Sequence, residues 1–207
     1  MHKNSMSLYV KYAAQYVSPG TRVLEIGPDK NPSTYQGLSP AGVSAWETID
    51  FAGRTDIELT HRQASEYSFP MPDNSYDVVV SGQVIEHVKK VWRWMPELAR
   101  VCKPGGYVIT INPVTYHYHE APVDCWRIYP EGMKALCEDS GLDVVLSKWE
   151  SVSIESLRKV LPDLFFRTMV FPRMSGVFDM LSRVIKTPAD GAFDTVTIAR
   201  KPLSATP

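Results

Sequence analysis

The segment "QVIEHV" combines three side chains that could bind a metal ion or move a proton. Gln83, Glu86 and His87 stand at positions i, i+3 and i+4, so a helix that starts here would carry all three on one face. Carboxylate oxygens and imidazole nitrogens bind divalent cations, whereas the amide of Gln83 is a weaker ligand for a hard ion such as Mg2+. The alternative is structural: Glu86 would stabilise the helix start and His87 would pack beside a sheet.

A second group of reactive side chains lies in "TYHYHEAPVDCWRIYP". It holds His117, His119, Glu120, Asp124 and Arg127 among aromatic residues and prolines. Loops on a rigid scaffold are where catalytic groups concentrate, and histidine is the side chain best suited to accept a proton at neutral pH. We expect a general base or substrate-binding role, with His119 as the first candidate, followed by Glu120, Asp124 and His87. The alternative is a packed surface loop. The His-x-His-Glu spacing matches no closed zinc site.

The turn in "VLEIGPDKNPS" has the features of a ligand-binding loop. A buried strand runs into Glu25 and then Gly27, and Asp29 stands where a second glycine would be expected. A dinucleotide would bring a pyrophosphate to this turn, and Asp29 would repel it. S-adenosylmethionine has no phosphate and carries a sulfonium and an ammonium, so nearby carboxylates are favourable. If position 29 needs a positive φ, aspartate accepts it better than most residues. Asp50 ends the next strand, where a carboxylate can bind both ribose hydroxyls.

These residues require a sheet that brings strand ends together. Apolar runs and alternation predict strands over 22–27, 44–51, 56–62, 76–80, 107–114, 142–150 and 193–201. Helical spacing predicts helices over 7–17, 83–102 and 131–140, and a helical region over 154–186 that Pro162 and Pro172 interrupt. Such alternation predicts an α/β fold with a mostly parallel sheet. Ligands of these sheets bind beyond the carboxyl ends of the strands, which places the site after positions 25, 50, 81 and 112.

Length and composition restrict the class of protein. The chain of 207 residues is long enough for one domain, expected to span 1–207. Its net charge of −1 argues against a nucleic-acid partner held by phosphate neutralisation. No apolar run is long enough to cross a bilayer, so we expect no stable membrane insertion. The three scattered cysteines suggest no disulfide framework, which favours the cytoplasm.

The motifs together resemble the class I S-adenosylmethionine-dependent methyltransferases, in the small-molecule branch of the type 11 kind. The resemblance covers about residues 22–141 and rests on "VLEIGP", "ETID", "FPMPDNSYDVVVSGQVIEHV" and "LARVCKPGGYVITINP". It implies a Rossmann-like, doubly wound, mostly parallel seven-stranded sheet, with helices on both faces and a helical insertion before the last strand. It also implies a set of cofactor-binding residues: Glu25, Gly27, Pro28, Asp50, Gln63, Ala64, Ser81 and Gln83.

Within this resemblance, the ubiquinone-pathway O-methyltransferases place a metal site where this chain has Gln83, Glu86 and His87. Glu86 and His87 are therefore metal candidates, with Mg2+ as the ion. The loop around Trp126 also resembles methyltransferases of bacterial carbohydrate modification. The expected function is methyl transfer from S-adenosylmethionine to a hydroxyl of a small acceptor, with a sugar or glycoside preferred, by a monomer or homodimer. The alternatives are N- or C-methylation, a non-catalytic partner subunit, and a nicotinamide-dependent oxidoreductase that Asp29 disfavours. Residues 154–186 are expected to form a helical excursion between the last two strands that partly covers the active site as a lid. A dimer face is an alternative, and a membrane-surface element ranks last.

Overall fold

The computed structural model describes residues 3–51, 53–63, 65–120, 123–152 and 192–203. Seven strands form one sheet in the order β3-β2-β1-β4-β5-β7-β6. The strands are β1 (Arg22–Ile26), β2 (Ala45–Phe51), β3 (His61–Gln63), β4 (Tyr76–Gly82), β5 (Cys102–Pro113), β6 (Asp143–Glu150) and β7 (Asp194–Arg200). All pairs are parallel except those of β7, which runs antiparallel to both β5 and β6. The predicted Rossmann-like α/β fold with a mostly parallel seven-stranded sheet is confirmed.

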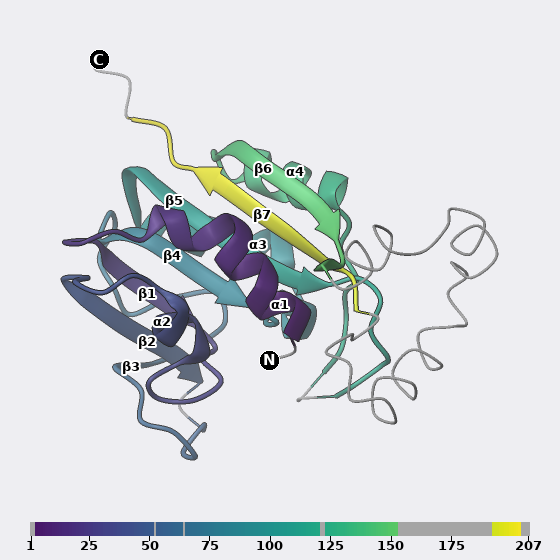
Figure 1. Ribbon diagram of the computed structural model, residues 1–207, viewed down its shortest axis with the longest axis horizontal. Coiled ribbons are helices and arrows are strands. Elements are labelled where there is room, and N and C mark those ends of the chain that lie inside the picture. Colours follow the sequence, from purple (N-terminus) through teal and green to yellow (C-terminus); the bar gives the residue numbers. More distant parts are fainter. Residues whose placement is uncertain (1–2, 52, 64, 121–122, 153–191, 204–207) are drawn as a thin grey trace.

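Helices pack on both faces of this sheet (Figure 1). Successive residues of β4 point to opposite faces: Val78 and Val80 join a core cluster with the N-terminal helical segment, and Val79 joins the cluster that contains α3. The helices are α1 (Lys3–Leu8), α2 (Thr34–Leu38), α3 (Val91–Val101) and α4 (Pro130–Asp139), and α1 continues as a π-helical turn and a 3-10 turn to Tyr16. None of the helices in the described ranges combines the length and apolar character that a bilayer crossing needs.

Several predicted boundaries differ from the structure: β5 begins at Cys102 rather than at position 107, and α2 was not predicted. The helix expected over 83–102 is a short 3-10 turn (Ile85–His87) followed by α3. Gln83 has a φ of +60° and Lys90 has a non-helical backbone, so the helix is interrupted at both residues. The apolar residues keep a helical spacing across these interruptions. The N-terminal helical segment begins at position 3 rather than 7, and β3 begins at 61 rather than 56. The helical insertion expected at 154–186 lies outside the described residues, so the single domain over 1–207 stays a prediction.

Candidate active site

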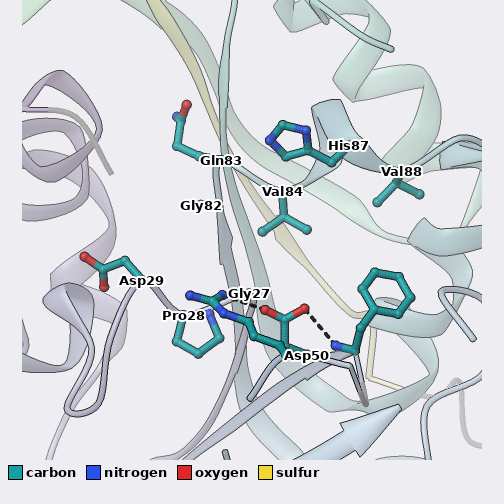
Figure 2. Close-up of a pocket in the computed structure, with 11 residues that line it drawn as sticks. Gly27, Pro28, Asp29, Asp50, Gly82, Gln83, Val84, His87 and Val88 are labelled. Atoms are coloured by element: carbon teal, nitrogen blue, oxygen red, sulfur yellow. Dashed lines mark hydrogen bonds and ion pairs between the residues drawn. The ribbon is translucent and has the colours of Figure 1, made fainter. Parts of the chain in front are cut away.

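The main cavity of the described residues lies at the carboxyl ends of β1, β2 and β4 and has a volume of about 610 Å3. The chain leaves β1 towards β2 and β3 on one side and continues through β4 and β5 on the other. A crevice forms where the order of strands reverses in this way. Figure 2 shows its lining, which consists of Gly27, Pro28, Asp29, Asp50, Phe51, Arg54, Gly82, Gln83, Val84, His87 and Val88.

Gly27 allows β1 and the segment after β4 to approach each other. Its φ is +66°, which L side chains rarely adopt, and its N–H donates to the carbonyl of Ile49 at 2.9 Å. A Cβ at this position would lie 2.5 Å from Cγ2 of Val84. Both the backbone conformation and the available space therefore require glycine at this wall of the cavity.

Asp29 shapes the turn through its side chain. Its carboxylate accepts hydrogen bonds from the backbone N–H and the hydroxyl of Thr34, at 2.9 and 2.6 Å. Although burial opposes the shift, these hydrogen bonds lower the pKa of Asp29, so its charge persists at the cavity. Asp29 is not among the described residues with positive φ. The conformational reason considered for an aspartate at this position therefore does not apply.

Asp50 lies at the end of β2 and already has two donors. Its carboxylate accepts from the backbone N–H of Phe51 at 2.8 Å and from Nη1 of Arg54 at 2.7 Å (Figure 2). Arg54 also lines the cavity, and the sequence analysis missed it. The only available signal was the spacing of four residues between a strand-end acid and a base. The apolar lining residues Phe51, Val84 and Val88 had no sequence signal that separates them from ordinary core residues.

Three other predicted cofactor residues are buried and do not line the cavity directly. Glu25 accepts hydrogen bonds from the Ser33 hydroxyl and from Nε1 of Trp46, and burial raises its pKa to about 7. Ser81 and Gln63 are also buried, and each has a side-chain oxygen without a hydrogen-bond partner. Ala64 lies outside the described residues. Gly27, Pro28, Asp50 and Gln83 lie at the cavity wall, and the cofactor roles of all the predicted residues stay predictions.

Gln83 does not share a helix face with Glu86 and His87, because it precedes the 3-10 turn in a left-handed conformation. Its side chain donates to Oδ1 of Asp194 at 3.2 Å, and its backbone N–H donates to the carbonyl of Ile111 at 2.8 Å. The three-residue face expected from the i, i+3, i+4 spacing is therefore wrong.

The loop after β5 packs directly on the turn that holds Glu86 and His87. The N–H of Cys125 donates to the carbonyl of Glu86 at 2.7 Å, and Nε1 of Trp126 donates to the carbonyl of Val88 at 2.8 Å. Nδ1 of His87 lies 2.5 Å from the carbonyl of Val123. Since a carbonyl only accepts, Nδ1 carries the proton and Nε2 presents a lone pair. The two groups of reactive side chains identified in the sequence thus belong to one site.

Glu86, His87 and His119 form the centre of this site. A carboxylate oxygen and one nitrogen from each imidazole all lie within 4.8 Å of one another. The two rings meet edge to face with centroids 5.0 Å apart, and Nε2 of His87 is 3.8 Å from Oε1 of Glu86. Glu86 is fully buried, and neither of its carboxylate oxygens has a hydrogen-bond partner. Burial raises the pKa of Glu86 to about 8.

Asp124 supports His119. Its carboxylate accepts from the backbone N–H of His119 at 2.8 Å and lies 3.3 Å from Nδ1 of the same residue. The Arg127 guanidinium binds both oxygens of Asp124 and holds the pKa of that carboxyl well below its usual range. A carboxylate so strongly paired is a poor proton acceptor. Glu120 is exposed and accepts a hydrogen bond from the Tyr118 hydroxyl, so these contacts give it no link to the cluster.

Comparisons with known proteins agree with this geometry. The family described as "Methyltransferase domain" matches residues 38–110. An uncharacterised methyltransferase of Mycobacteroides abscessus is 32% identical over 111 residues, which are 51% of this chain and 39% of the relative. The chain thus spans about two fifths of the length of that curated relative.

Two solved structures share the fold. A protein of Haloferax volcanii, described as a methyltransferase in complex with the activator Trm112, superimposes with a TM-score of 0.65 at 15% identity, covering 98% of this chain and 91% of that one. Phosphoethanolamine N-methyltransferase 2 of Haemonchus contortus, in complex with S-adenosyl-L-methionine, has a TM-score of 0.56 at 14% identity, covering 96% and 52%. The fold is Rossmann-like, with a crevice at the point where the order of strands reverses. Residues 38–110 thus match a methyltransferase domain family, and the chain is similar to methyltransferases in sequence and in fold.

Proposed function

We propose that the cavity binds S-adenosylmethionine and that the protein transfers its methyl group to a hydroxyl of a small acceptor, preferably a sugar or glycoside. The observation that carries the proposal is the charge of the cavity wall. Asp29 and Asp50 both line it, and Asp29 is held ionised at the turn where a dinucleotide would place its pyrophosphate. A cationic sulfonium and ammonium suit this wall better than a diphosphate does. Asp50, after its contact with Arg54 rearranges, would accept from the ribose hydroxyls.

Methyl transfer is an in-line displacement in which a bond forms between the acceptor oxygen and the methyl carbon while the carbon–sulfur bond breaks. The sulfur leaves as a neutral thioether, and the hydroxyl proton must be removed. The protein has to align the three atoms and exclude water. His87 lines the cavity and its ring contacts that of His119. We therefore place activation of the acceptor hydroxyl at this imidazole pair, with Asp124 orienting His119.

The preference for a sugar rests on the aromatic residues near the cluster. Tyr116 and Tyr118 flank His117 in the loop and are exposed, and the ring of Tyr116 lies 5.3 Å from that of His119. Sugar faces pack on aromatic rings, and sugar hydroxyls bind charged side chains. An amine acceptor is the second candidate, because the structural neighbour from Haemonchus contortus is an N-methyltransferase. An amine would need less assistance from a base, so substitution of His119 by alanine would leave its methylation largely intact.

Calorimetric titration tests the cofactor. We expect S-adenosylhomocysteine to bind and NAD not to bind. Asp50→Asn should weaken binding about tenfold or more, since it removes a charged acceptor at the cavity. Asp143→Asn, which changes an exposed carboxylate at the start of β6, is the matched control and should bind as the wild type does. Binding of NAD in place of S-adenosylhomocysteine would overturn the proposal.

An acceptor screen with labelled S-adenosylmethionine tests the reaction. Label should pass to a mono- or disaccharide hydroxyl, and alanine at His119 should reduce this transfer at least a hundredfold. Transfer to amines alone would establish the second candidate. Tight binding of the cofactor without transfer to any acceptor would instead point to a non-catalytic partner subunit.

A further inference from the structure

Glu86 is a buried carboxyl with no hydrogen-bond partner in the described part of the chain. Its two oxygens have no hydrogen-bond donor, although the residue is fully enclosed. Burial of a carboxylate without a hydrogen bond or a counter-charge is costly, and proteins usually pair such a group or use it as a metal ligand.

Both imidazoles near Glu86 are prepared to offer a nitrogen lone pair. Nδ1 of His87 donates to the Val123 carbonyl, so in the neutral ring the lone pair lies on Nε2, which is 3.8 Å from Oε1 of Glu86. Nδ1 of His119 lies 3.3 Å from Asp124 and 3.2 Å from the His117 carbonyl, two groups that only accept. Its proton therefore resides on Nδ1, and Nε2 carries the lone pair. A carboxylate or carbonyl behind an imidazole is the usual outer contact of a metal-bound histidine.

The spacing of the three groups fits one ion. Bonds of about 2.0 to 2.2 Å from a divalent transition metal place its ligand atoms up to about 4 Å apart. The three candidate ligand atoms lie within 4.8 Å of one another without an ion between them. Small side-chain rotations therefore suffice to close the set. Because His87 also lines the cavity, an ion held here would keep a coordination position towards the acceptor.

We propose that Glu86, His87 and His119 bind one borderline divalent cation of the Zn2+ class, with an open position that faces the cavity. This proposal rests on the proposed function and specifies how the acceptor hydroxyl is activated. Two imidazoles and one carboxylate suit zinc and its neighbours in the first transition row, whereas Mg2+ prefers an all-oxygen set. This proposal differs from the Mg2+ site expected from Glu86 and His87 in the ion and in the addition of His119 as a third ligand. A bound ion of this class lowers the pKa of a hydroxyl that coordinates to it.

The test uses Co2+ as a spectroscopic substitute for Zn2+, on the tag-free full-length chain stripped with a chelator. We expect one equivalent of Co2+ to produce visible absorption bands of a protein-bound site. An equimolar amount of Zn2+ should remove them, and a hundredfold excess of Mg2+ should not. Absence of binding at stoichiometric Co2+, or displacement by Mg2+, would overturn the proposal.

Single substitutions locate the site. His119→Ala and His87→Ala should each weaken Co2+ binding by a factor of about 100. His117→Ala is the matched control, because its ring lies 6.0 Å from that of His119 in the same loop but it is not part of the cluster. It should bind Co2+ with unchanged affinity. Full binding in His119→Ala would show that the third ligand is wrong.

Two further measurements separate this proposal from the function it rests on. Circular dichroism and S-adenosylhomocysteine binding show whether each variant is folded. If S-adenosylhomocysteine binds and Co2+ does not, the metal site fails and the methyl-transfer proposal stands. If Co2+ binds and S-adenosylhomocysteine does not, the cofactor proposal fails and the metal site stands.

Discussion

At the scale of single residues, the surroundings of each carboxyl group decide its charge. Hydrogen-bond donors lower the pKa values of Asp29 and Asp124, whereas burial raises those of Glu25 and Glu86, and the two donors to Glu25 do not offset its burial. Two strand-end acids that look equivalent in the sequence, Glu25 and Asp50, differ in their position relative to the cavity. Only Asp50 reaches the cavity wall. Position at a strand end could be predicted, but burial could not.

Glu25 gives the stability of the protein a distinctive pH dependence. Its pKa rises from 4.5 in the unfolded chain to about 7 in the fold, so the folded state keeps the proton to higher pH. The contribution of Glu25 to the free energy of unfolding is therefore greatest below pH 4.5 and falls as pH rises towards 7. Between pH 5 and 8 the wild type should lose about 2 to 3 kcal/mol more than Glu25→Gln. Urea unfolding at both pH values measures this difference, and equal losses in the two proteins would contradict it.

The cluster of Glu86 and His119 marks the limit of sequence reasoning about residues. Each residue belonged to a recognised motif, but Glu86 and His119 are 33 positions apart, with α3 and β5 between them. Their meeting depends on the hydrogen bonds of Cys125 and Trp126 to the turn after β4. Backbone contacts of this kind have no residue pattern, so the sequence supports two separate hypotheses where the structure has one site.

At the scale of elements, the turn after β1 depends on the close approach of Gly27 to Val84. Gly27→Ala should weaken S-adenosylhomocysteine binding at least tenfold, because a Cβ would meet Cγ2 of Val84 at 2.5 Å in a left-handed conformation. Gly20→Ala is the matched control: its φ is +85°, but nothing lies within 4 Å of the added carbon. It should lose stability only. Equal affinity in the two variants would contradict the role of this contact.

A polar network joins four strands through Glu47 in β2. The residue accepts hydrogen bonds from Arg22, His61 and Tyr76, which belong to β1, β3 and β4. Burial would raise the pKa of Glu47, but these hydrogen bonds lower it from 4.5 to about 2. The stability from this group is thus present above pH 4.5 and is lost as pH falls towards 2.

We expect Glu47→Gln to lower the free energy of unfolding by about 1 to 2 kcal/mol at pH 7, after allowance for solvent screening. The difference from the wild type should shrink as the pH falls below 4.5. Denaturant unfolding at pH 7 and about pH 3, where more than half of the contribution should be lost, measures it. A constant difference across this range would show that the charge of Glu47 does not contribute.

Elements were predictable where the apolar pattern is strong. All seven strands have sequence signals, because β-branched runs such as those of β4 and β7 end at turn residues. The pattern failed between positions 83 and 91, where regular apolar spacing continues through Gln83 and Lys90 although neither residue is helical. Apolar spacing records which side chains are buried, and a 3-10 turn can bury the same residues as a helix does.

At the scale of the whole molecule, the topology of the sheet determines where the cavity lies. The reversal of strand order between β1 and β4 opens the cavity, and this position followed from the alternation of strands and helices. Ligand that binds only the folded state should stabilise the molecule as a unit. S-adenosylhomocysteine at a hundred times its dissociation constant should add about 2.7 kcal/mol and raise Tm by about 5 to 10 °C. Scanning calorimetry measures this shift, with NAD as the negative control.

The antiparallel strand β7 has a consequence for synthesis on the ribosome. It lies between β5 and β6, and β6 pairs with no other strand in the described residues. β6 leaves the exit tunnel more than forty residues before β7 does. Until β7 emerges, the backbone N–H and C=O groups that β7 pairs with in β5 and β6 have no hydrogen-bond partners from that strand. If translation stalls in this interval, the nascent chain would be an aggregation-prone intermediate with exposed strand edges, which chaperones would have to bind.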